Sequence, residues 1–297
     1  MTDFAIEACG LRKSFKGQIA LDGLTFAVPK GSIYGFLGRN GAGKTTTIRI
    51  LMGLAKADDG SARLFGLPNA GGKAGADLRR RIGFVTEDKE LYPYMNVEEI
   101  IRFTRPFFTG WRVDLEQRYL KAFDLPLKKK IPDLSKGMRS KLMLLLAVSR
   151  GAELLILDEP TDGLDPAAVE EVLRELVALS LAEGTTIFFS SHQLAEVEQI
   201  AGHISIIDKG RAIVSGPLED LKLRYQRIQV VLTEGFAENV RWAEGVEHVR
   251  QEGRVVSILA SHNVDAILAQ ARSLPVASVE RQPVGLKEIF LNHVRTN

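Results

Sequence analysis

Cysteine is almost absent from this sequence, since Cys9 is the only one among 297 residues. An intramolecular disulfide is therefore impossible, and a zinc site built from four cysteines of this chain is excluded. A lone thiol is typical of proteins in a reducing compartment. The N-terminal residues MTDFAIEACG lack a basic segment followed by an apolar one, so we expect no secretory signal.

Long hydrophobic runs are also missing. The longest candidate, LMLLLAV at residues 142–148, is far shorter than the roughly 18 residues that indicate a membrane-spanning helix. We therefore expect that the chain does not span a membrane by itself. The net charge is only +2, so a nucleic-acid partner is neither implied nor excluded. Hydrophobic residues make up 45% and charged residues 26%, which indicates a globular protein.

Strands and helices alternate along most of the chain, which predicts an α/β fold with helices on both faces of a parallel sheet. A strand at residues 32–37 leads into a glycine-rich loop and a helix, and residues 96–147 carry mainly helical patterns. The continuous apolar run at residues 153–160 is typical of a buried parallel strand. Further predicted elements are a strand at 4–15, a helix at 167–183, a strand at 185–191, a helix at 193–201 and a hairpin turning at 208–210.

The pattern changes past about Gly216, where short strands and helices predict a small α+β domain. We expect two domains, at residues 1–220 and 221–297, with a helical subdomain at about residues 90–150 of the first.

GRNGAGKT at residues 38–45 matches the pattern G-x-x-x-x-G-K-[S/T] without a mismatch. Glycines let backbone N–H groups turn toward phosphate oxygens, and the following helix adds the positive end of its dipole. We expect Lys44 to reach the outer phosphates and the Thr45 hydroxyl to ligate magnesium. The alternative is an ordinary glycine-rich turn, which explains neither the full match nor its position between a strand and a helix. The loop predicts a nucleoside triphosphate site.

A second motif, LLILDEP, ends an apolar strand expected beside the phosphate loop. Asp158 can hold magnesium directly or through water. Glu159 can accept a proton from an attacking water as a general base. The alternative is a strand end that carries solvated acids.

Together with LSKGM at residues 134–138 and SSH at residues 190–192, these motifs resemble the ATP-binding subunit of ABC transporters, in that family's order. The resemblance covers roughly residues 4–216. It implies a P-loop NTPase domain of the ABC type, with a mixed-sheet core, an antiparallel β subdomain and a helical subdomain. The α+β domain follows as an accessory.

The resemblance also implies roles for single residues. Phe15 falls where the family stacks an aromatic on adenine, and an ordinary core aromatic is the alternative. His192 matches a histidine that contacts the γ-phosphate, and a polar strand cap is the alternative. Asp165 matches a loop that touches a partner subunit. Because two such domains pack head to tail in the family, Ser135 and Gly137 are assigned to the γ-phosphate of the opposite copy's ATP. A serine-capped core helix would explain Ser135 alone.

The predicted site residues follow from the motifs and the resemblance. The nucleotide-binding residues are Phe15, Gly38, Arg39, Asn40, Gly41, Ala42, Gly43, Lys44, Thr45, Thr46, Ser135, Gly137 and His192. Catalytic roles are assigned to Lys44, Glu159 and His192, and magnesium ligation to Thr45, Glu87 and Asp158.

The chain departs from the family pattern at several positions. Lys136 and Met138 stand where glycine and glutamine are common, Arg39 where proline is usual, and Glu87 where glutamine is usual. A carboxylate can ligate magnesium as an amide oxygen does, so we expect Glu87 not to abolish hydrolysis. Because it also adds a negative charge near the γ-phosphate, we expect it to change the rate of hydrolysis. Glu87 and the SKGM sequence resemble ATPases that are paired with ABC-2-type export permeases.

The implied activity is ATP hydrolysis with ATP and Mg²⁺ as cofactors, by a homodimer that drives a separate membrane permease from the cytoplasmic face of the cell membrane. The expected permease contact is the helical subdomain with the loop Glu87–Tyr94, where Tyr92 and Tyr94 are candidate anchors. One alternative is a soluble ATPase in a nucleic-acid-linked role, which would need a coiled-coil insertion or a second phosphate loop. A sensor that binds ATP without turnover is the other, and Glu159 and His192 argue against it. No motif indicates the transported substance.

Overall fold

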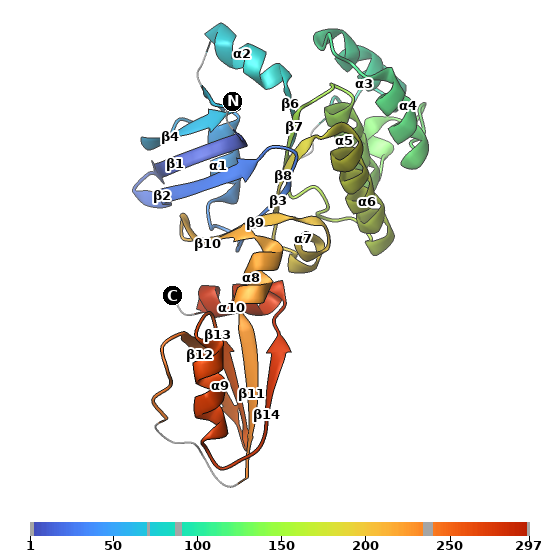
Figure 1. Ribbon diagram of the computed structural model, residues 1–297. Helices are drawn as coiled ribbons and strands as arrows, with labels where there is room; N and C mark the ends of the chain where they lie inside the picture. Colours follow the sequence, from blue (N-terminus) through green and yellow to red (C-terminus); the bar gives the residue numbers. More distant parts are fainter. Residues whose placement is uncertain (1–2, 70–71, 87–90, 234–239, 296–297) are drawn as a thin grey trace. The chain divides into compact units, whose positions relative to one another are not determined.

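The computed structural model describes residues 3–69, 72–86, 91–233 and 240–295. The chain divides into two compact units, Met1–Ser215 and Gly216–Asn297. Each unit has a hydrophobic core of its own, and Figure 1 shows the helices and strands of both units. Among the described residues, no helix is both long and apolar enough to cross a bilayer.

The first unit is organised around a six-stranded sheet. In spatial order its strands are β10 (Arg211–Pro217), β9 (His203–Asp208), β3 (Ile33–Gly38), β8 (Thr186–Ser191), β7 (Leu154–Asp158) and β6 (Ile82–Val85). All but β10 pair in parallel. Strand β10 follows its neighbour β9 through a tight turn and so runs antiparallel to it. The predicted mixed-sheet core is confirmed.

The two motif strands are not neighbours, because β8 lies between β3 and β7. Their carboxyl ends still share one edge of the sheet, since parallel strands end on the same side. The phosphate loop after β3 and the carboxylates after β7 therefore meet across the end of β8.

A second, antiparallel sheet forms the expected β subdomain, in the order β2 (Gln18–Pro29), β1 (Phe4–Phe15), β4 (Asp59–Leu64) and β5 (Leu67–Pro68). Aromatic rings join it to the main sheet. The ring of Phe26 on β2 lies 5.0 Å from that of Phe36 on β3 and 5.8 Å from that of Phe188 on β8. This packing fixes β1 and β2 near the phosphate loop.

Helices complete the first unit (Figure 1). They are α1 (Lys44–Leu51), α2 (Gly72–Arg80), α3 (Val97–Thr104), α4 (Val113–Ala122), α5 (Lys136–Val148), α6 (Pro166–Glu183) and α7 (Leu194–Ile200), with 3₁₀ turns at Arg105–Phe107 and Ile131–Asp133.

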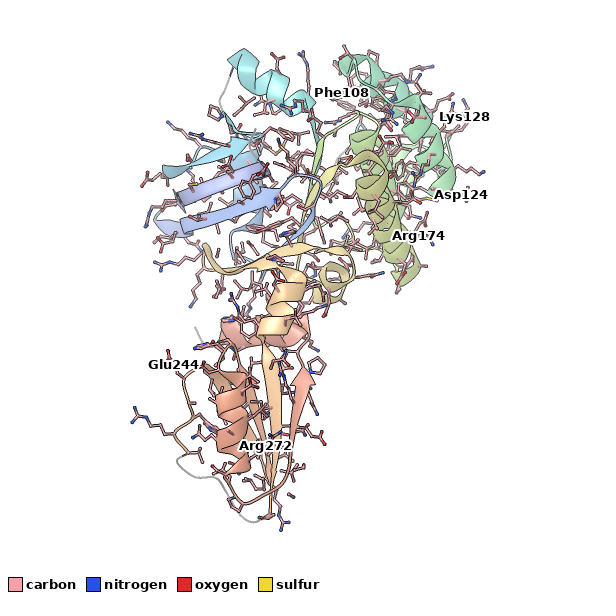
Figure 2. All side chains as sticks on the ribbon, viewed as in Figure 1. Phe108, Asp124, Lys128, Arg174, Glu244 and Arg272 are labelled. Carbon is pink, nitrogen blue, oxygen red and sulfur yellow. The ribbon has the colours of Figure 1, made fainter. Side chains whose placement is uncertain are left out.

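Helices α3, α4 and α5 form the expected helical subdomain, in which the side chain of Phe108 is labelled in Figure 2. Asn96 begins α3 with a reciprocal capping box with Glu99. Buried Glu116 accepts hydrogen bonds from Arg105 and Trp111. These contacts add polar links to the buried apolar side chains of the subdomain, among them Val97, Ile100 and Leu115.

The second unit is a small α+β domain, as expected. It begins with α8 (Leu218–Arg224) and contains an antiparallel sheet in the order β12 (Val246–Glu252), β13 (Val255–Ala260), β11 (Gln226–Leu232) and β14 (Val276–Pro283). Helix α9 (Val264–Arg272) covers one face, and α10 (Leu286–Arg295) ends the unit. Alternate residues of β11, including Ile228 and Val230, point into the core.

Candidate nucleotide-binding site

The phosphate loop ends at a glycine that no other residue could replace without strain. Gly43 has φ 110°, and a Cβ built on it would lie 2.7 Å from the carbonyl oxygen of Ala20. Helix α1 begins at the next residue, and no side chain caps its N-terminus. The backbone N–H groups of this first turn are therefore available to an anion.

Lys44 is buried between two oxygen atoms. Its Nζ donates to the carbonyl oxygen of Gly38 at 2.8 Å and lies 3.2 Å from Oε1 of Glu159. Both charged side chains are less than a tenth exposed. A buried cation held by one carboxylate and one carbonyl has room for a further anionic partner, because an ammonium has three donors.

One serine contacts both acidic residues at the end of β7. The Ser190 hydroxyl donates to Oδ1 of Asp158 at 2.7 Å and accepts from the backbone N–H of Glu159 at 3.0 Å. Glu159 has φ 48°, a left-handed conformation that is strained for a glutamate. Ser190 thus stabilises an unusual turn that aims the Glu159 side chain back toward the phosphate loop.

His192 follows β8 and faces the same carboxylate. Its Nδ1 lies 2.8 Å from Oε2 of Glu159, and its backbone N–H donates to the same oxygen at 3.3 Å. The two oxygens of Glu159 therefore contact different residues, Lys44 and His192. The structure brings together all three residues that the sequence analysis assigned to catalysis.

Asp158 lies beneath this group and is 3% exposed. Burial raises the pKa of Asp158 above its ordinary value, while hydrogen bonds from Ser190 and Thr45 lower it. A buried carboxylate beside a threonine hydroxyl supplies two oxygen ligands of the kind that Mg²⁺ prefers. The chemistry of this pair suits a divalent cation, which would also compensate the buried charge.

A cavity of about 580 Å³ opens in front of these residues. It is lined by Phe15, Gln18, Ile19, Ala20, Arg39, Asn40, Gly41, Gly43, Lys44, Thr45, Thr46, Glu159, Asp162 and His192. Ala42 lines an adjoining cavity, and Gly38 takes part through the carbonyl that holds Lys44. Phe15 is 48% exposed at the cavity rim, so the interpretation of it as a core aromatic is wrong.

The segment LSKGM at residues 134–138, called the signature loop below, is not among the described residues that line this cavity. Ser135 is exposed, and its hydroxyl accepts from the backbone N–H of Met138 at 3.1 Å, which begins helix α5. Lys136 forms an ion pair with Asp162, and Asp165 caps α6 by accepting from Ala168. Ser135 and Gly137 therefore have no contact with their own chain's phosphate loop in this arrangement.

Arg39 and Glu87 are two further departures from the family pattern. Arg39 is exposed at the cavity mouth, so its long side chain does not obstruct the loop. Glu87, the third predicted magnesium ligand, lies outside the described residues.

Sequence reasoning missed the residues that support the site from behind. Ser190 was not singled out, although it is the first residue of the SSH motif at residues 190–192. Glu196 and Thr161 were also missed. The Thr161 hydroxyl donates to Oε2 of Glu196 at 2.6 Å, and both side chains are buried. The only signal was a glutamate four residues after His192, one helical turn into a predicted helix.

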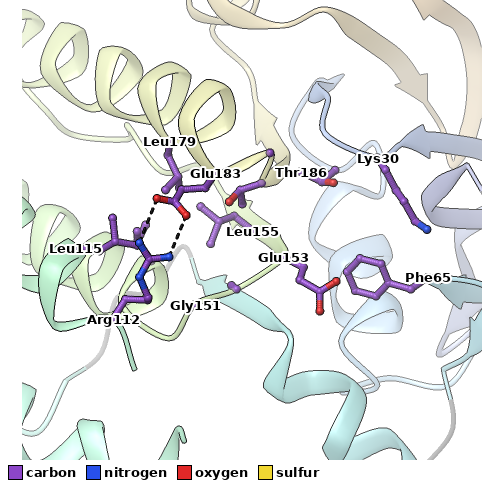
Figure 3. A pocket seen from close by; sticks show the side chains of 14 residues that line it. Lys30, Phe65, Arg112, Leu115, Gly151, Glu153, Leu155, Leu179, Glu183 and Thr186 are labelled. Atoms are coloured by element: carbon purple, nitrogen blue, oxygen red, sulfur yellow. Dashed lines mark hydrogen bonds and ion pairs between the residues drawn. The ribbon is translucent and has the colours of Figure 1, made fainter. Parts of the chain in front are cut away.

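Another cavity, of about 350 Å³, lies at the opposite, amino-terminal edge of the strands (Figure 3). It contains charged side chains of both signs, and both of its carboxylates form ion pairs. Arg112 binds Glu183, as the dashed lines in Figure 3 show, and Arg81 binds Glu153. The two carboxylates of this cavity are therefore already compensated within the chain.

Comparisons with known proteins agree with the geometry. The family described as ABC transporter matches residues 21–162. The bacitracin transport ATP-binding protein BcrA of Bacillus licheniformis is 37% identical over 75% of this chain and 72% of its own. The daunorubicin resistance ATP-binding protein DrrA3 of Streptomyces coeruleorubidus is 34% identical over 99% of this chain and 95% of its own.

Solved structures show the same fold. An ATP-binding subunit of an ABC transporter superposes with a TM-score of 0.67 at 31% identity, over 74% of this chain and 92% of that chain. A dimeric cassette, MJ0796 in a post-hydrolysis state with ADP and phosphate, has a TM-score of 0.66 at 20% identity, over 72% of this chain and 98% of that chain. The predicted fold class is confirmed, and the family match supports the prediction that the chain binds ATP. The chain belongs to the ATP-binding subunits of ABC transporters, whose P-loop domains are ATPases.

Proposed function

We propose that this chain hydrolyses ATP with Glu159 as the general base and Lys44 and His192 as contacts to the γ-phosphate. The supporting observation is that these three side chains meet at one cavity, with Glu159 in contact with both of the others. When ATP enters, its γ-phosphate competes with Glu159 for Lys44. The carboxylate oxygen released from Lys44 can then accept a proton from a water that attacks the phosphate.

Magnesium belongs to the same proposal. Thr45 and Asp158 fit a divalent cation because they supply adjacent hydroxyl and carboxylate oxygens, and Asp158 is otherwise an incompletely compensated buried charge. When bound, the cation neutralises phosphate charge. The assignment of Glu87 as a further ligand stays a proposal from the sequence.

The active unit is proposed to be a head-to-tail homodimer with ATP at its interface. Ser135 is exposed at the start of α5, where a hydroxyl and free backbone N–H groups suit an anion. Because this loop does not line its own chain's nucleotide cavity, we assign its anion to another copy. Asp165, which the resemblance matches to a loop that touches the partner subunit, caps the N-terminus of α6. It lies in the same loop as Asp162, which lines the nucleotide cavity.

A membrane permease is the proposed partner, reached from the cytoplasmic face of the membrane. A groove of about 500 Å³ in the helical subdomain is lined by Phe84, Leu91, Tyr92, Pro93, Ile100, Phe103, Thr104, Met143, Leu146 and Arg150. Four exposed aromatic residues lie here, Tyr92, Tyr94, Phe103 and Phe107. The ring of Tyr92 packs against those of Tyr94 and Phe103, and the ring of Phe103 packs against that of Phe107. An exposed aromatic cluster beside a groove is typical of a protein contact.

Export is the proposed direction. The relatives BcrA and DrrA3 are a bacitracin transport protein and a daunorubicin resistance protein. Moving an antibiotic away from its target is a common physical basis of resistance. The SKGM sequence and Glu87 support the same subgroup.

The partner proposal can be tested by co-purification from detergent-solubilised membranes of the native host. We expect the wild-type chain to retain one integral membrane protein whose sequence has the hydropathy of a permease. The double variant Tyr92→Ala/Phe103→Ala should lose it. Leu181→Ala is the matched control, because Leu181 is 82% exposed on α6 outside the groove. Recovery of no membrane protein, or equal recovery with all three chains, would contradict the proposal.

A further inference from the structure

Glu196 is a buried carboxylate with no cationic partner among the described residues. It lies in the first turn of α7 and is 5% exposed. Its Oε2 accepts hydrogen bonds from the hydroxyls of Thr161 at 2.6 Å and Ser191 at 3.3 Å. Its Oε1 is buried without a hydrogen-bond partner. Buried Glu116, in contrast, has an arginine partner.

Such a group is costly to keep in a folded protein. A buried carboxylate that lacks a cation loses hydration that its hydrogen bonds only partly replace. Burial accordingly raises the pKa of Glu196 above its ordinary value. Replacing both Glu196 and its partner Thr161 with apolar residues of similar size should leave the stability nearly unchanged, because no buried donor of this pair is then left without an acceptor. The contribution of the pair to folding therefore does not explain its presence.

The two hydroxyls that Glu196 binds belong to the two segments that carry the proposed catalytic pair. Thr161 lies two residues after Glu159, and Ser191 immediately precedes His192. Glu196 thus connects, from the buried side, the same two loops that the contact between Glu159 and His192 connects from the cavity side.

We propose that Glu196 is a positioning residue for ATP hydrolysis, because one of its carboxylate oxygens holds the Thr161 and Ser191 hydroxyls and thereby sets the distance between Glu159 and His192. This inference rests on the proposed roles of Glu159 and His192. Glu196 does not touch the nucleotide cavity, so it acts through these two segments. A displacement of about 1 Å in such a pair can cost about 100-fold in rate.

Three variants separate position, charge and folding. Glu196→Gln keeps an oxygen that can accept both hydroxyls, whereas Glu196→Leu removes it. We expect Glu196→Leu to lower kcat for phosphate release by about 10- to 100-fold. The KM for ATP and the Kd of a fluorescent ATP analogue should stay unchanged, because the phosphate loop is intact. Glu196→Gln should retain kcat within about threefold of wild type, and Thr161→Val should reproduce part of the loss.

Thermal unfolding distinguishes a positioning role from a purely structural one, because a purely structural role would lower the melting temperature together with kcat. We expect the double variant Glu196→Leu/Thr161→Val to melt at nearly the wild-type temperature while its kcat falls, whereas Glu196→Leu alone leaves the Thr161 hydroxyl without an acceptor and should melt lower. A melting temperature of the double variant that falls together with ATP affinity would overturn the inference, and so would a kcat for Glu196→Gln as low as that for Glu196→Leu. These failures are distinct from failure of the proposed function, in which wild type itself would release no phosphate or Glu159→Gln would release it normally.

Discussion

Lys136 Nζ lies 2.6 Å from Oδ2 of Asp162, and this ion pair joins the signature loop to the loop that follows Glu159. Asp162 lines the chain's own nucleotide cavity, whereas Lys136 follows Ser135, which is proposed to contact the partner copy's ATP. The lysine that departs from the family pattern therefore links the two half-sites of one chain. It is part of the site's structure and not an obstruction in it.

The ion pair itself should add little stability. Lys136 and Asp162 are 51% and 36% exposed, and exposed pairs contribute up to about 1 kcal/mol. We expect Lys136→Gln to lower the free energy of unfolding, measured in urea, by less than about 1 kcal/mol. A loss several times larger would mean that the pair is a main stabilising contact of this loop.

The packing beneath the pair should matter more. Gly163 has φ 72°, and a Cβ on it would lie 2.4 Å from Lys136 Nζ. Gly184 has φ 65° with no neighbouring atom within 4 Å, so it is a matched control. Both alanine variants should lose about 1 kcal/mol of unfolding free energy from the left-handed backbone. Only Gly163→Ala should also weaken ATP-dependent dimerisation in light scattering, because it displaces Lys136. Equal dimerisation of both variants would argue against this link.

The motifs and the order of elements were predictable because they are local in sequence. The glycine loop, the apolar strand before Asp158 and the helix after Ser135 each have a pattern of their own. Contacts between distant segments were not. Ser190 reaches Asp158, and Lys136 reaches Asp162, only because β7, β8 and α5 pack together. No periodicity or spacing indicates which hydroxyl will face which carboxylate.

Phe15 provides a test of adenine binding. Its ring is half exposed at the cavity rim, with Lys13 Nζ 5.2 Å from the ring centre. Loss of a base–aromatic stack costs about 1–3 kcal/mol, so Phe15→Ala should raise the Kd for ATP by about 5- to 150-fold in a fluorescence titration. Phe15→Tyr should bind as wild type does, and Phe107→Ala is an exposed aromatic control. An unchanged Kd for Phe15→Ala would remove Phe15 from the site.

Asp158 provides a test of the metal. Asp158→Asn keeps the oxygen that accepts from Ser190 but removes the buried charge. Wild type should gain thermal stability from ATP with Mg²⁺ far more than from ATP with EDTA. In Asp158→Asn this difference should disappear, while the nucleotide-free variant melts no lower than wild type because a poorly compensated charge is gone. A preserved magnesium effect would exclude Asp158 as a ligand.

The second unit should become less stable as the pH falls. His293 Nε2 lies 2.8 Å from the Tyr225 hydroxyl, and burial lowers the pKa of His293 below its ordinary value of 6.5. The unfolded chain then binds more protons than the folded one, so the stability present above about pH 6.5 is lost as the pH falls toward the folded-state pKa. Trp242 fluorescence in a Trp111→Phe background can follow unfolding of this unit. His293→Gln should flatten the dependence below pH 6.5, and an unaltered slope would assign it to other groups.

The most direct test of the account is steady-state phosphate release by wild type, Glu159→Gln and Glu170→Gln. Glu170 is an exposed glutamate on α6 and serves as the control for the same chemical change. Wild type and Glu170→Gln should release phosphate at similar rates. Glu159→Gln should be slower by about 100-fold or more, since general-base catalysis contributes about 10²- to 10⁴-fold, and it should accumulate as an ATP-bound dimer. Undiminished phosphate release by Glu159→Gln would contradict the assignment of the base and the mechanism built on it.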